Sequence, residues 1–383
     1  MALDSCLACG KGLKPVADLG GSPVLTGALF DDRASARRAV SGRLDLGMCQ
    51  DCGHVQNVAF DPERVQYDVS YDNSLHFSPT FQRYADELAA GLVDRYGIRS
   101  KRIVEVGSGK GDFLRSICAL GGNTGTGYDP TVEPDTDIPG VQLVQAYFRP
   151  GHEVEPYDLL VCRHVLEHLD DPAGLLRALS GAARPDALHY FEVPAAEFNF
   201  GPDGLWDCIY PHVSYFSQTS LATLIRRCGF EIVSIRRAFH GQFLTVEARA
   251  RDIPATTETG PEAHLALVSH FAERYRASVA RWRAHAVRTR VRGQTFVVWG
   301  AGSKGVNFLN AVDPDGDLTA VDVNPRKWGK YLPLGGHAVI APAWLTTLDV
   351  SEVVVTNPVY KDEIAQSLID LGVKPHITGI SCP

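Results

Sequence analysis

The middle of the chain alternates apolar runs with amphipathic stretches. Short apolar runs bounded by glycine or polar residues predict strands at residues 102–106, 124–129, 157–162 and 187–193. Apolar positions that recur at helical spacing predict helices at residues 79–95, 112–120, 172–183 and 218–229. This alternation predicts a parallel sheet that helices cover on both faces. Two further apolar segments, residues 232–235 and 243–248, fit closing strands at one edge, as an antiparallel pair.

A second α/β pattern fills the C-terminal part. Residues 264–292 contain no glycine or proline, and they predict a helical linker. A small Rossmann-like unit follows, with a predicted helix at 306–312 and predicted strands at 295–299, 318–321, 337–340 and 352–355. A chain of 383 residues exceeds one ordinary core. We therefore divide it into a module at residues 1–68, a core at 69–255, a linker at 256–290 and a C-terminal domain at 291–383.

A glycine-rich turn follows the first predicted strand of the core. Residues 105–112 read Glu-Val-Gly-Ser-Gly-Lys-Gly-Asp, so glycine recurs at positions 107, 109 and 111. Alternating glycines let a backbone turn sharply and approach a ligand that a Cβ atom would push away. The pattern differs from the Gly-x-Gly-x-x-Gly of nicotinamide dinucleotide folds, whose third glycine would fall on Asp112. It resembles the S-adenosylmethionine loop of class I methyltransferases.

The next predicted strand ends at Asp129, about 20 residues beyond the glycines. An acid at this place can accept hydrogen bonds from both hydroxyl groups of a ribose. The resemblance implies S-adenosylmethionine as the cofactor; a loop for another nucleotide, or for no ligand, is the alternative. The expected cofactor contacts are Glu105, Gly107, Ser108, Gly109, Gly111, Asp129, Pro130, Arg163 and His164.

Four of the nine cysteines are patterned. Cys6 and Cys9 form one Cys-x-x-Cys pair, and Cys49 and Cys52 form another. Two such pairs can hold a zinc ion with four thiolates, the closed arrangement of structural sites, provided that an inserted hairpin or loop fills residues 10–48. The alternative of two redox dithiols is weaker, because neither pair follows a strand in a β-α-β context. The other five cysteines fit small core positions.

A second glycine loop, Gly300-Ala301-Gly302-Ser303-Lys304-Gly305, does match the dinucleotide pattern, and Asp322 ends the next predicted strand. Taken alone, this loop predicts a nicotinamide-dependent oxidoreductase. However, the C-terminal unit is short for a dinucleotide domain with both halves. We favour partial substrate binding, in which Lys304 contacts a phosphate; a tight turn without a ligand stays open.

Two clusters of histidine and tyrosine supply candidates for catalysis. His164 and His168 follow a strand at the edge where parallel sheets bind ligands; the pair either binds a metal or places one imidazole in the cleft. Residues 206–217, which resemble a lid, contain Tyr210, His212 and Tyr215. Histidine exchanges a proton near neutral pH, and a phenol can orient a carbonyl. We expect His212, or else His168, to be the base, with Tyr210 or Tyr215 as the orienting donor; buried core aromatics are the alternative.

Further residues are candidates for contacts with the substrate. Residues 67–78 join the first two domains and are rich in polar and aromatic side chains, so this segment can fold over the cleft. The expected substrate contacts are Tyr71, Asn73, His76, His240 and Lys304.

The charge pattern limits the partners. The net charge is −8 and no block of lysine or arginine occurs, which argues against nucleic acid and anionic membranes. No secretion signal or long apolar run is present, so a cytoplasmic protein is expected. We expect a small-molecule substrate and a monomer or homodimer.

Taken together, the motifs resemble those of the three-domain sugar C-methyltransferases. The resemblance covers the whole chain: the cysteine pairs, the first glycine loop, residues 165–168, 209–217 and 240–241, the second glycine loop, and residues 321–333. It implies an α/β fold with a zinc-binding N-terminal module, a class I methyltransferase core that is Rossmann-like, and a smaller C-terminal Rossmann-like domain. It also implies a nucleotide-linked keto-deoxysugar, of the kind used in antibiotic biosynthesis, that is deprotonated beside its ketone and methylated at that carbon.

The chain departs from this family's pattern at positions that contact the sugar. The lid segment Tyr210-Pro211-His212 is one residue shorter and lacks the family's glutamate, and Gln242 replaces the second glycine of a pair. An O- or N-methyltransferase on the same scaffold is therefore an alternative, because it needs a base but no enolate stabiliser. A nicotinamide-binding oxidoreductase or binding protein is the minor alternative.

Overall fold

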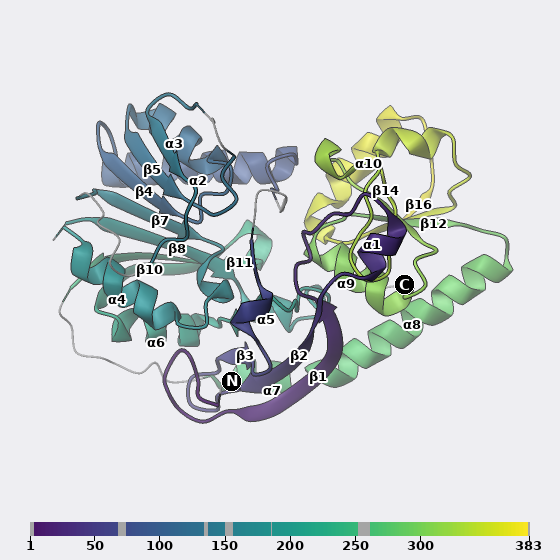
Figure 1. Ribbon diagram of the computed structural model, residues 1–383, viewed down its shortest axis with the longest axis horizontal. Coiled ribbons are helices and arrows are strands. Elements are labelled where there is room, and N and C mark those ends of the chain that lie inside the picture. Colours follow the sequence, from purple (N-terminus) through teal and green to yellow (C-terminus); the bar gives the residue numbers. More distant parts are fainter. Residues whose placement is uncertain are drawn as a thin grey trace.

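The computed structural model describes residues 4–67, 74–133, 137–149, 156–184, 186–251 and 261–381. Three sheets organise this part of the chain, and two lobes lie side by side above a curved N-terminal hairpin (Figure 1). The predicted substrate residues Tyr71 and Asn73 lie outside the described residues. The same holds for the predicted domain boundaries after residues 68 and 255, which therefore stay predictions.

The core sheet has seven strands in the order β10-β11-β8-β7-β4-β5-β6. They span β10 Phe230–Ala238, β11 Phe243–Ala250, β8 Leu188–Pro194, β7 Leu159–Arg163, β4 Arg102–Val106, β5 Thr124–Tyr128 and β6 Val141–Val144. Strands β6, β5, β4, β7 and β8 run parallel, whereas β11 is antiparallel to both β8 and β10. The parallel sheet and the antiparallel pair at its edge confirm the prediction; the edge strand β6 was not predicted.

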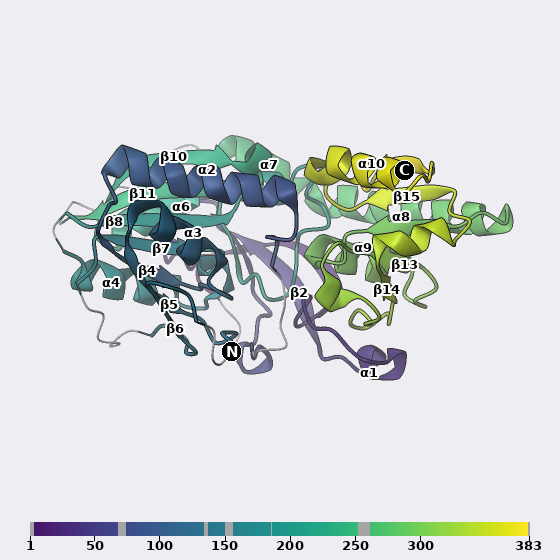
Figure 2. The same cartoon turned by 90° about the horizontal axis from the view of Figure 1, so that it is seen from above.

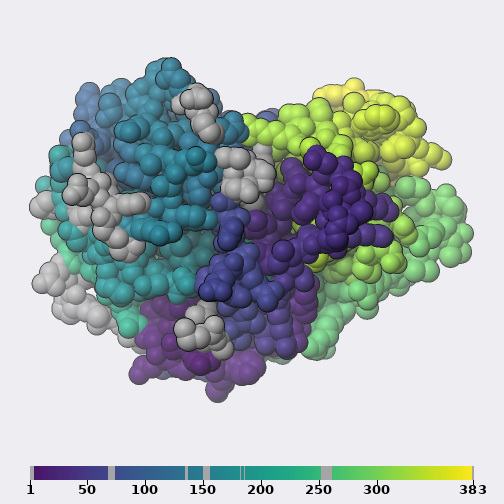
Figure 3. Space-filling model, in the orientation of Figure 1, coloured from purple at the N-terminus to yellow at the C-terminus, as the bar shows by residue number. Residues whose placement is uncertain are grey.

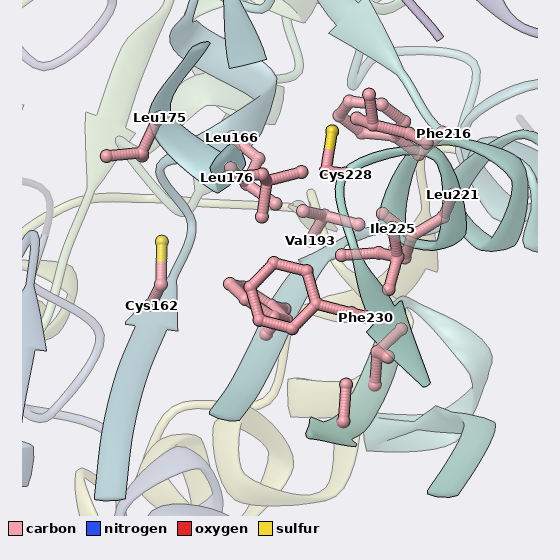
Figure 4. Close-up of a cluster of buried hydrophobic side chains, with 14 of the residues drawn as sticks. Cys162, Leu166, Leu175, Leu176, Val193, Phe216, Leu221, Ile225, Cys228 and Phe230 are labelled. Atoms are coloured by element: carbon pink, nitrogen blue, oxygen red, sulfur yellow. The ribbon is translucent and has the colours of Figure 1, made fainter. Parts of the chain in front are cut away.

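Helices cover both faces of this sheet because its central strands are apolar on both sides. Ile103, Leu159 and Val161 pack with helices α2 (Pro79–Tyr96) and α3 (Asp112–Gly121), which Figure 2 shows together over one face. Val104, Leu160 and Cys162, which alternate with them, pack against α4 (Pro172–Ala182) and α6 (Gln218–Arg227). Figure 4 shows this second cluster, with Cys162 and Val193 below helical leucines. Strands that are buried on both faces read as unbroken apolar runs, which is why the sequence located them well.

The N-terminal module shares a sheet with the core. Strands β1 (Lys14–Pro23), β2 (Ser41–Met48) and β3 (Val55–Asn57) are antiparallel, and β9 (Ser214–Tyr215), which belongs to the predicted lid, adds to β3. The long β1–β2 hairpin is the predicted insertion between the two cysteine pairs. The lid is therefore held by the module rather than projecting freely from the core.

The tip of this hairpin reaches the C-terminal domain, as Figures 1 and 3 show for the segment around α1 (Arg33–Arg37). Phe30 forms a two-way backbone bridge with Tyr331. The Arg33 guanidinium donates to the Gly316 carbonyl over 2.5 Å, and that of Arg37 donates to the Asp315 carbonyl. We name residues 24–40 the arm; it fastens the first part of the chain to the last.

The C-terminal domain is a five-stranded parallel sheet in the order β14-β13-β12-β15-β16. Its strands are β12 Phe296–Trp299, β13 Thr319–Val321, β14 Val339–Ile340, β15 Glu352–Val355 and β16 His376–Gly379, with helices α9 Ser303–Val312 and α10 Lys361–Asp370. The predicted Rossmann-like architecture is confirmed, with β16 as an additional strand. No helix among the described residues combines the length and apolarity needed to cross a membrane.

The predicted helical linker is two helices rather than one. Helix α7 (Glu262–Ser269) ends where the side chains of Ser269 and His270 both reach back to the carbonyl of Ala266, at 2.8 and 3.0 Å. Such bonds compete with the backbone ladder of a helix. Helix α8 (Phe271–Val291) then runs diagonally beneath the C-terminal lobe (Figure 1), where the Trp282 indole donates to the Ile380 carbonyl at 2.9 Å.

Candidate active site and metal site

The four patterned cysteines converge on one point. The Sγ atoms of Cys6 and Cys52 are 3.6 Å apart, and those of Cys9 and Cys49 are 3.4 Å apart. All four sulfur atoms lie within 4.8 Å of one another. Four thiolates around a tetrahedral zinc ion, with Zn–S bonds of about 2.3 Å, would be separated by ~3.8 Å. The cluster is therefore compatible with zinc and leaves no ligand position for a substrate.

Local turns bring the sulfurs together. Gly10 and Gly53 follow the two pairs with φ of 79° and 71°, a conformation that glycine adopts without strain. Their amides donate to the carbonyls of Cys6 and Cys49 at 2.7 and 3.0 Å. Arg227 at the end of α6 donates to the Ala8 carbonyl at 3.0 Å, and this hydrogen bond fixes the cysteine cluster to the core.

The first glycine loop has the conformation that its sequence predicts. Gly107, Gly109 and Gly111 all have positive φ, at 75°, 54° and 84°. A Cβ atom at Gly107 would lie 2.2 Å from Cγ2 of Val165, so the loop packs tightly against the turn that follows β7. The loop leads into α3, whose N-terminal amides favour an anionic or polar ligand.

Asp129 lies beside this loop, as predicted. One carboxylate oxygen accepts the Gly109 amide at 2.9 Å, and the other accepts the amide and hydroxyl of Thr131 at 2.7 and 2.6 Å. The predicted cofactor residue Ser108 is buried in the loop, and Pro130 follows Asp129 directly. The acid and the loop thus form one surface at the carboxyl ends of β4 and β5.

Glu105 is a buried acid at the end of β4. Its Oε2 atom has no hydrogen-bond partner among the described residues, and burial raises the pKa of this carboxyl group to about 8. Asp129 and Asp112 act in the same direction as burial, whereas Arg163 opposes it. A buried carboxyl oxygen without a hydrogen-bond partner among the described residues, such as Oε2 of Glu105, is the kind of polar atom that a bound ligand can satisfy.

A buried ion-pair network centres on Glu192, which sequence reasoning missed. Arg163 donates to one carboxylate oxygen of Glu192 at 3.0 Å, and Tyr190 donates to the other at 2.8 Å. The hydroxyl group of Tyr84 also donates to Glu192. Despite full burial, Arg163, His164 and Tyr84 hold the pKa of Glu192 far below its usual range. A carboxylate inside the apolar strand β8 is the sequence signal that could have revealed this network.

His164 joins this network to the turn after β7. Its Nε2 atom is 3.1 Å from Glu192, and its Nδ1 atom is 3.6 Å from Glu167. Burial opposes the charged imidazole, but the two glutamates at these distances outweigh it and raise the pKa of His164 to about 9. The positive φ of 55° at His164 is uncommon for a residue with a Cβ atom, and such strain clusters at functional sites.

His168 and His212 face each other, which the sequence predicted only as two separate candidates. His168 belongs to a short 3-10 turn, Leu166–His168, and its ring centre is 4.8 Å from that of His212. Nδ1 of His168 lies 3.0 Å from the Pro211 carbonyl and 3.0 Å from the Tyr67 hydroxyl. Burial lowers the pKa of both imidazoles, so both are neutral at pH 7. Tyr67 is the first residue of the segment that is expected to cover the cleft. The tyrosine expected to contact the substrate is Tyr71, which lies outside the described residues.

The hydroxyl groups of the two predicted orienting tyrosines form hydrogen bonds with backbone atoms. The Tyr210 hydroxyl accepts the Asp61 amide at 2.9 Å, and its ring packs with Phe60. The Tyr215 hydroxyl bonds both the amide and the carbonyl of Ile209 at 3.0 Å. Both side chains are fully buried, so they help to hold the lid in place, and their role as orienting donors stays a prediction. Tyr67 is the phenol that contacts the imidazole pair.

Lys304, on the second glycine loop, lies at the junction of the two lobes. Its ammonium group is 2.9 Å from Asp207 and 3.5 Å from the side-chain oxygen of Gln242. Lys304 also lies close enough to His212 to lower the pKa of that imidazole, after burial and the two histidines His168 and His164. The charge of Lys304 thus acts on the predicted base, and its role as a substrate contact stays a prediction.

The rest of the second glycine loop is bonded within the chain. Asp322, the acid that a dinucleotide fold would offer to a ribose, accepts the Ala301 amide at 2.8 Å and lies 3.3 Å from the Lys327 ammonium. Thr26 of the arm meets Ser303 at 3.0 Å. These contacts fasten the second glycine loop to the arm and to the end of β13, so the loop has a structural role.

Two other predicted substrate residues lie in different surroundings. His76 is 2.7 Å from the Gln82 side chain and packs edge-on against Phe81. His240 is exposed and lines a shallow cavity of about 150 Å³ with Phe198 and Arg237. Neither contacts the imidazole pair, and both assignments stay predictions.

Two domain models match this chain. A methyltransferase domain matches residues 81–235, and a C-methyltransferase C-terminal domain matches residues 249–373. C-methyltransferase NovU of Streptomyces niveus is 26% identical over an alignment of 369 residues, which covers 86% of this chain and 84% of that protein. Along most of its length the chain is therefore similar to the C-methyltransferases. It is an S-adenosylmethionine-dependent methyltransferase with a class I core, as the sequence predicted.

Two further similarities each cover less than half of the chain. The ubiquinone biosynthesis O-methyltransferase of Hydrogenovibrio crunogenus is 30% identical over an alignment of 157 residues, which covers 34% of this chain and 63% of that protein. Among solved structures, magnesium protoporphyrin IX methyltransferase from Synechocystis with bound SAM covers 45% of this chain and 80% of its own, at 15% identity and a TM-score of 0.34.

The first glycine loop of this methyltransferase is suited to bind S-adenosylmethionine, and a substitution at Gly107 tests this assignment. We expect Gly107→Ala to lower affinity for S-adenosylmethionine at least tenfold, because φ is positive there and the new Cβ atom would collide with Val165. Isothermal titration calorimetry measures the change. Gly122→Ala is the matched control, since it shares a positive φ, has open space around its Cβ position and lies at the opposite end of α3 from the loop. Equal affinities in the two variants would contradict the assignment of the loop.

Proposed function

We propose that the enzyme methylates a carbon atom beside the ketone of a nucleotide-linked keto-deoxysugar, through an enolate. The observation that carries this proposal is the pair of neutral imidazoles, His168 and His212, next to the methyl-donor loop. Val165, three residues before His168, fills the space beside Gly107, so the imidazole turn and the loop are in contact. A neutral imidazole can accept a proton from carbon, and a positioned base of this kind contributes about 10²–10⁴-fold to a rate.

In this proposal, different residues remove the proton, hold the base in place and stabilise the developing charge. His212 is our first candidate for the base that removes the α-proton, and His168 is the second. Tyr67 and the Pro211 carbonyl hold His168 in place. The ammonium group of Lys304, whose charge acts on His212, is suited to stabilise the enolate oxygen or a phosphate. Near-attack positioning of the carbon nucleophile supplies much of the remaining acceleration.

S-adenosylmethionine supplies an electrophilic methyl group on its sulfonium. The residues proposed to hold it are Glu105, the loop glycines, Ser108, Asp129, Pro130, Arg163 and His164. Of these, Arg163 acts through Glu192, because its guanidinium is bonded there, and His164 lies between Glu192 and Glu167. The four cysteines are proposed to bind structural zinc.

The support for a sugar nucleotide is the resemblance of the whole chain together with the second glycine loop. This loop brings Lys304 to the core, where Gln242 and Asn357 bond each other across the lobes at 3.0 Å. A charged group at such a junction suits a substrate that carries a phosphate and spans both lobes. The acceptor therefore contacts both the core and the C-terminal domain in this proposal.

Mass spectrometry of reactions in deuterated water tests the proposal. The enzyme is incubated with S-adenosylmethionine and a panel of thymidine-diphosphate keto-deoxysugars. We expect a methyl group on carbon, and deuterium exchange at that carbon when the methyl donor is left out. Protein that binds the donor but neither exchanges nor methylates any sugar of the panel would refute this substrate class.

O- or N-methylation is the second candidate. It is favoured by the similarity to an O-methyltransferase, which is 30% identical over an alignment of 157 residues. Such a reaction needs only one base, which His212 or His168 also provides. The position of the methyl group in the product distinguishes the two reactions. A methyl group on oxygen or nitrogen, without deuterium exchange at carbon, would replace the enolate mechanism.

A further inference from the structure

Glu167 is a buried carboxylate that the proposed mechanism does not yet use. It lies in the turn after β7, and 1% of its surface is exposed. Neither carboxylate oxygen has a hydrogen-bond partner among the described residues. The nearest cationic group is Nδ1 of His164, at 3.6 Å. Leaving a charged group buried without hydrogen bonds costs free energy, so its retention at this place needs a reason.

The imidazole pair lies next to this carboxylate. One oxygen of Glu167, one ring nitrogen of His168 and one ring nitrogen of His212 all lie within 4.8 Å of one another. The three side chains come from two segments, the turn after β7 and the lid before β9. Glu192, the other carboxylate nearby, already accepts from Arg163, Tyr84 and Tyr190. Glu167 is therefore the carboxylate that faces the imidazoles and accepts no hydrogen bond from the described residues.

We infer that the Glu167 carboxylate stabilises the imidazolium that forms when the His168–His212 pair removes the α-proton. This inference rests on the proposed function and adds a positioning residue to it. The carbon–hydrogen bond breaks, its electron pair remains on the substrate as an enolate, and the proton goes to an imidazole nitrogen. Glu167 takes no proton; its charge acts through space on the imidazole.

The charges around the pair show why this carboxylate matters. The imidazolium of His164 and the ammonium of Lys304 both disfavour a further positive charge on His212, as does His168 when it is protonated. Glu167 acts in the opposite direction on His168. An opposite charge within about 4–6 Å can move a pKa by ~1–3 units in a buried site. Without Glu167, burial and the neighbouring cations would leave the pair a weak base.

A divalent metal ion is the competing explanation for two imidazoles and a carboxylate that converge. Two features favour the proton-transfer explanation. The positive charges of His164 and Lys304 would repel a metal ion, and His164 already neutralises part of the charge on Glu167. Metal content is therefore one of the outcomes that the test must separate.

The test compares kcat and kcat/KM as functions of pH in the full-length zinc-loaded enzyme. In Glu167→Gln we expect kcat to fall at least tenfold and the acid limb of kcat/KM to move to lower pH by about one unit or more, because the base loses its stabilising charge. In His164→Asn the acid limb should move to higher pH, since a cation is removed. Glu352→Gln, which alters a carboxylate 2.7 Å from His285 in the C-terminal domain, should leave the limb unchanged.

Several outcomes would overturn the inference. A Glu167→Gln enzyme that loses activity equally at every pH, with an unmoved acid limb, would give Glu167 a merely structural role. A second metal ion per chain in the wild type, absent from Glu167→Gln, would make the cluster a metal site. If Glu167→Gln does not fold, Glu167→Asp keeps the charge on a shorter side chain and should shift the limb less. Wild-type enzyme that methylates without exchanging the α-proton would instead refute the proposed function itself.

Discussion

Replacing His212 with alanine is expected to lower turnover by a factor on the order of 10² or more, with little change in affinity for S-adenosylmethionine. His212 is 8% exposed, belongs to the lid, and faces His168 across 4.8 Å between ring centres. Its ring does not contact the first glycine loop in any bond described above, so donor binding should survive. Turnover is measured with the methyl acceptor, and donor affinity is measured separately by calorimetry.

A matched histidine variant separates this effect from general damage. His376→Ala, on the exposed end of β16 in the C-terminal domain, should retain wild-type turnover. His212→Gln keeps much of the side-chain volume and should be as inactive as His212→Ala, since the amide cannot accept the proton. Near-wild-type turnover in either His212 variant would remove this residue from the mechanism and transfer the role to His168.

Removing the metal from the cysteine cluster is expected to cause the largest loss of stability. Cys49→Ser, or extraction with a strong chelator, should lower the free energy of unfolding by about 4 kcal/mol or more, because a structural zinc ion contributes directly to folding. Cys49 is fully buried and packs in the same apolar cluster as Leu221 and Phe216 of the core. Damage at the metal site should therefore spread to the lid, which β3 holds through β9.

Thermal unfolding monitored by circular dichroism, with zinc counted by mass spectrometry, measures this effect. Cys118→Ser is the control: it changes a buried cysteine of α3 that takes no part in the cluster. We expect one zinc ion per chain in the wild type and in the control, and less than one in Cys49→Ser. Full zinc content in Cys49→Ser, with unchanged unfolding temperature, would contradict a four-thiolate site.

The fold of the core was predictable because its signals are local. Each central strand is an unbroken apolar run, and each covering helix shows apolar positions at helical spacing. The glycine loop and Asp129 were predictable for the same reason, since the loop conformation depends on adjacent residues. The four cysteines were found from their spacing alone, and their sulfurs do converge.

The rest depended on contacts between distant segments, which no local pattern encodes. The pairing of β3 with β9, and of the arm with the C-terminal domain, joins residues far apart in sequence. The site shows the same limit. His168 and His212 were both candidates, but neither their pairing nor the neighbouring Glu167 followed from the sequence. The hydroxyl groups of Tyr210 and Tyr215 turned out to be bonded to the backbone because the lid is packed rather than open.

The arm also has a consequence for the order in which this protein assembles on the ribosome. Its backbone bridge joins Phe30 to Tyr331, and Arg33 holds the Gly316 carbonyl. At about 5–20 residues per second, the ribosome adds these partners ~15–60 seconds after the arm itself. During that interval the core can fold while the arm remains without its partner. A segment that is synthesised early is thus among the last to reach its final position, and completion of the C-terminal domain locks the N-terminal module in place.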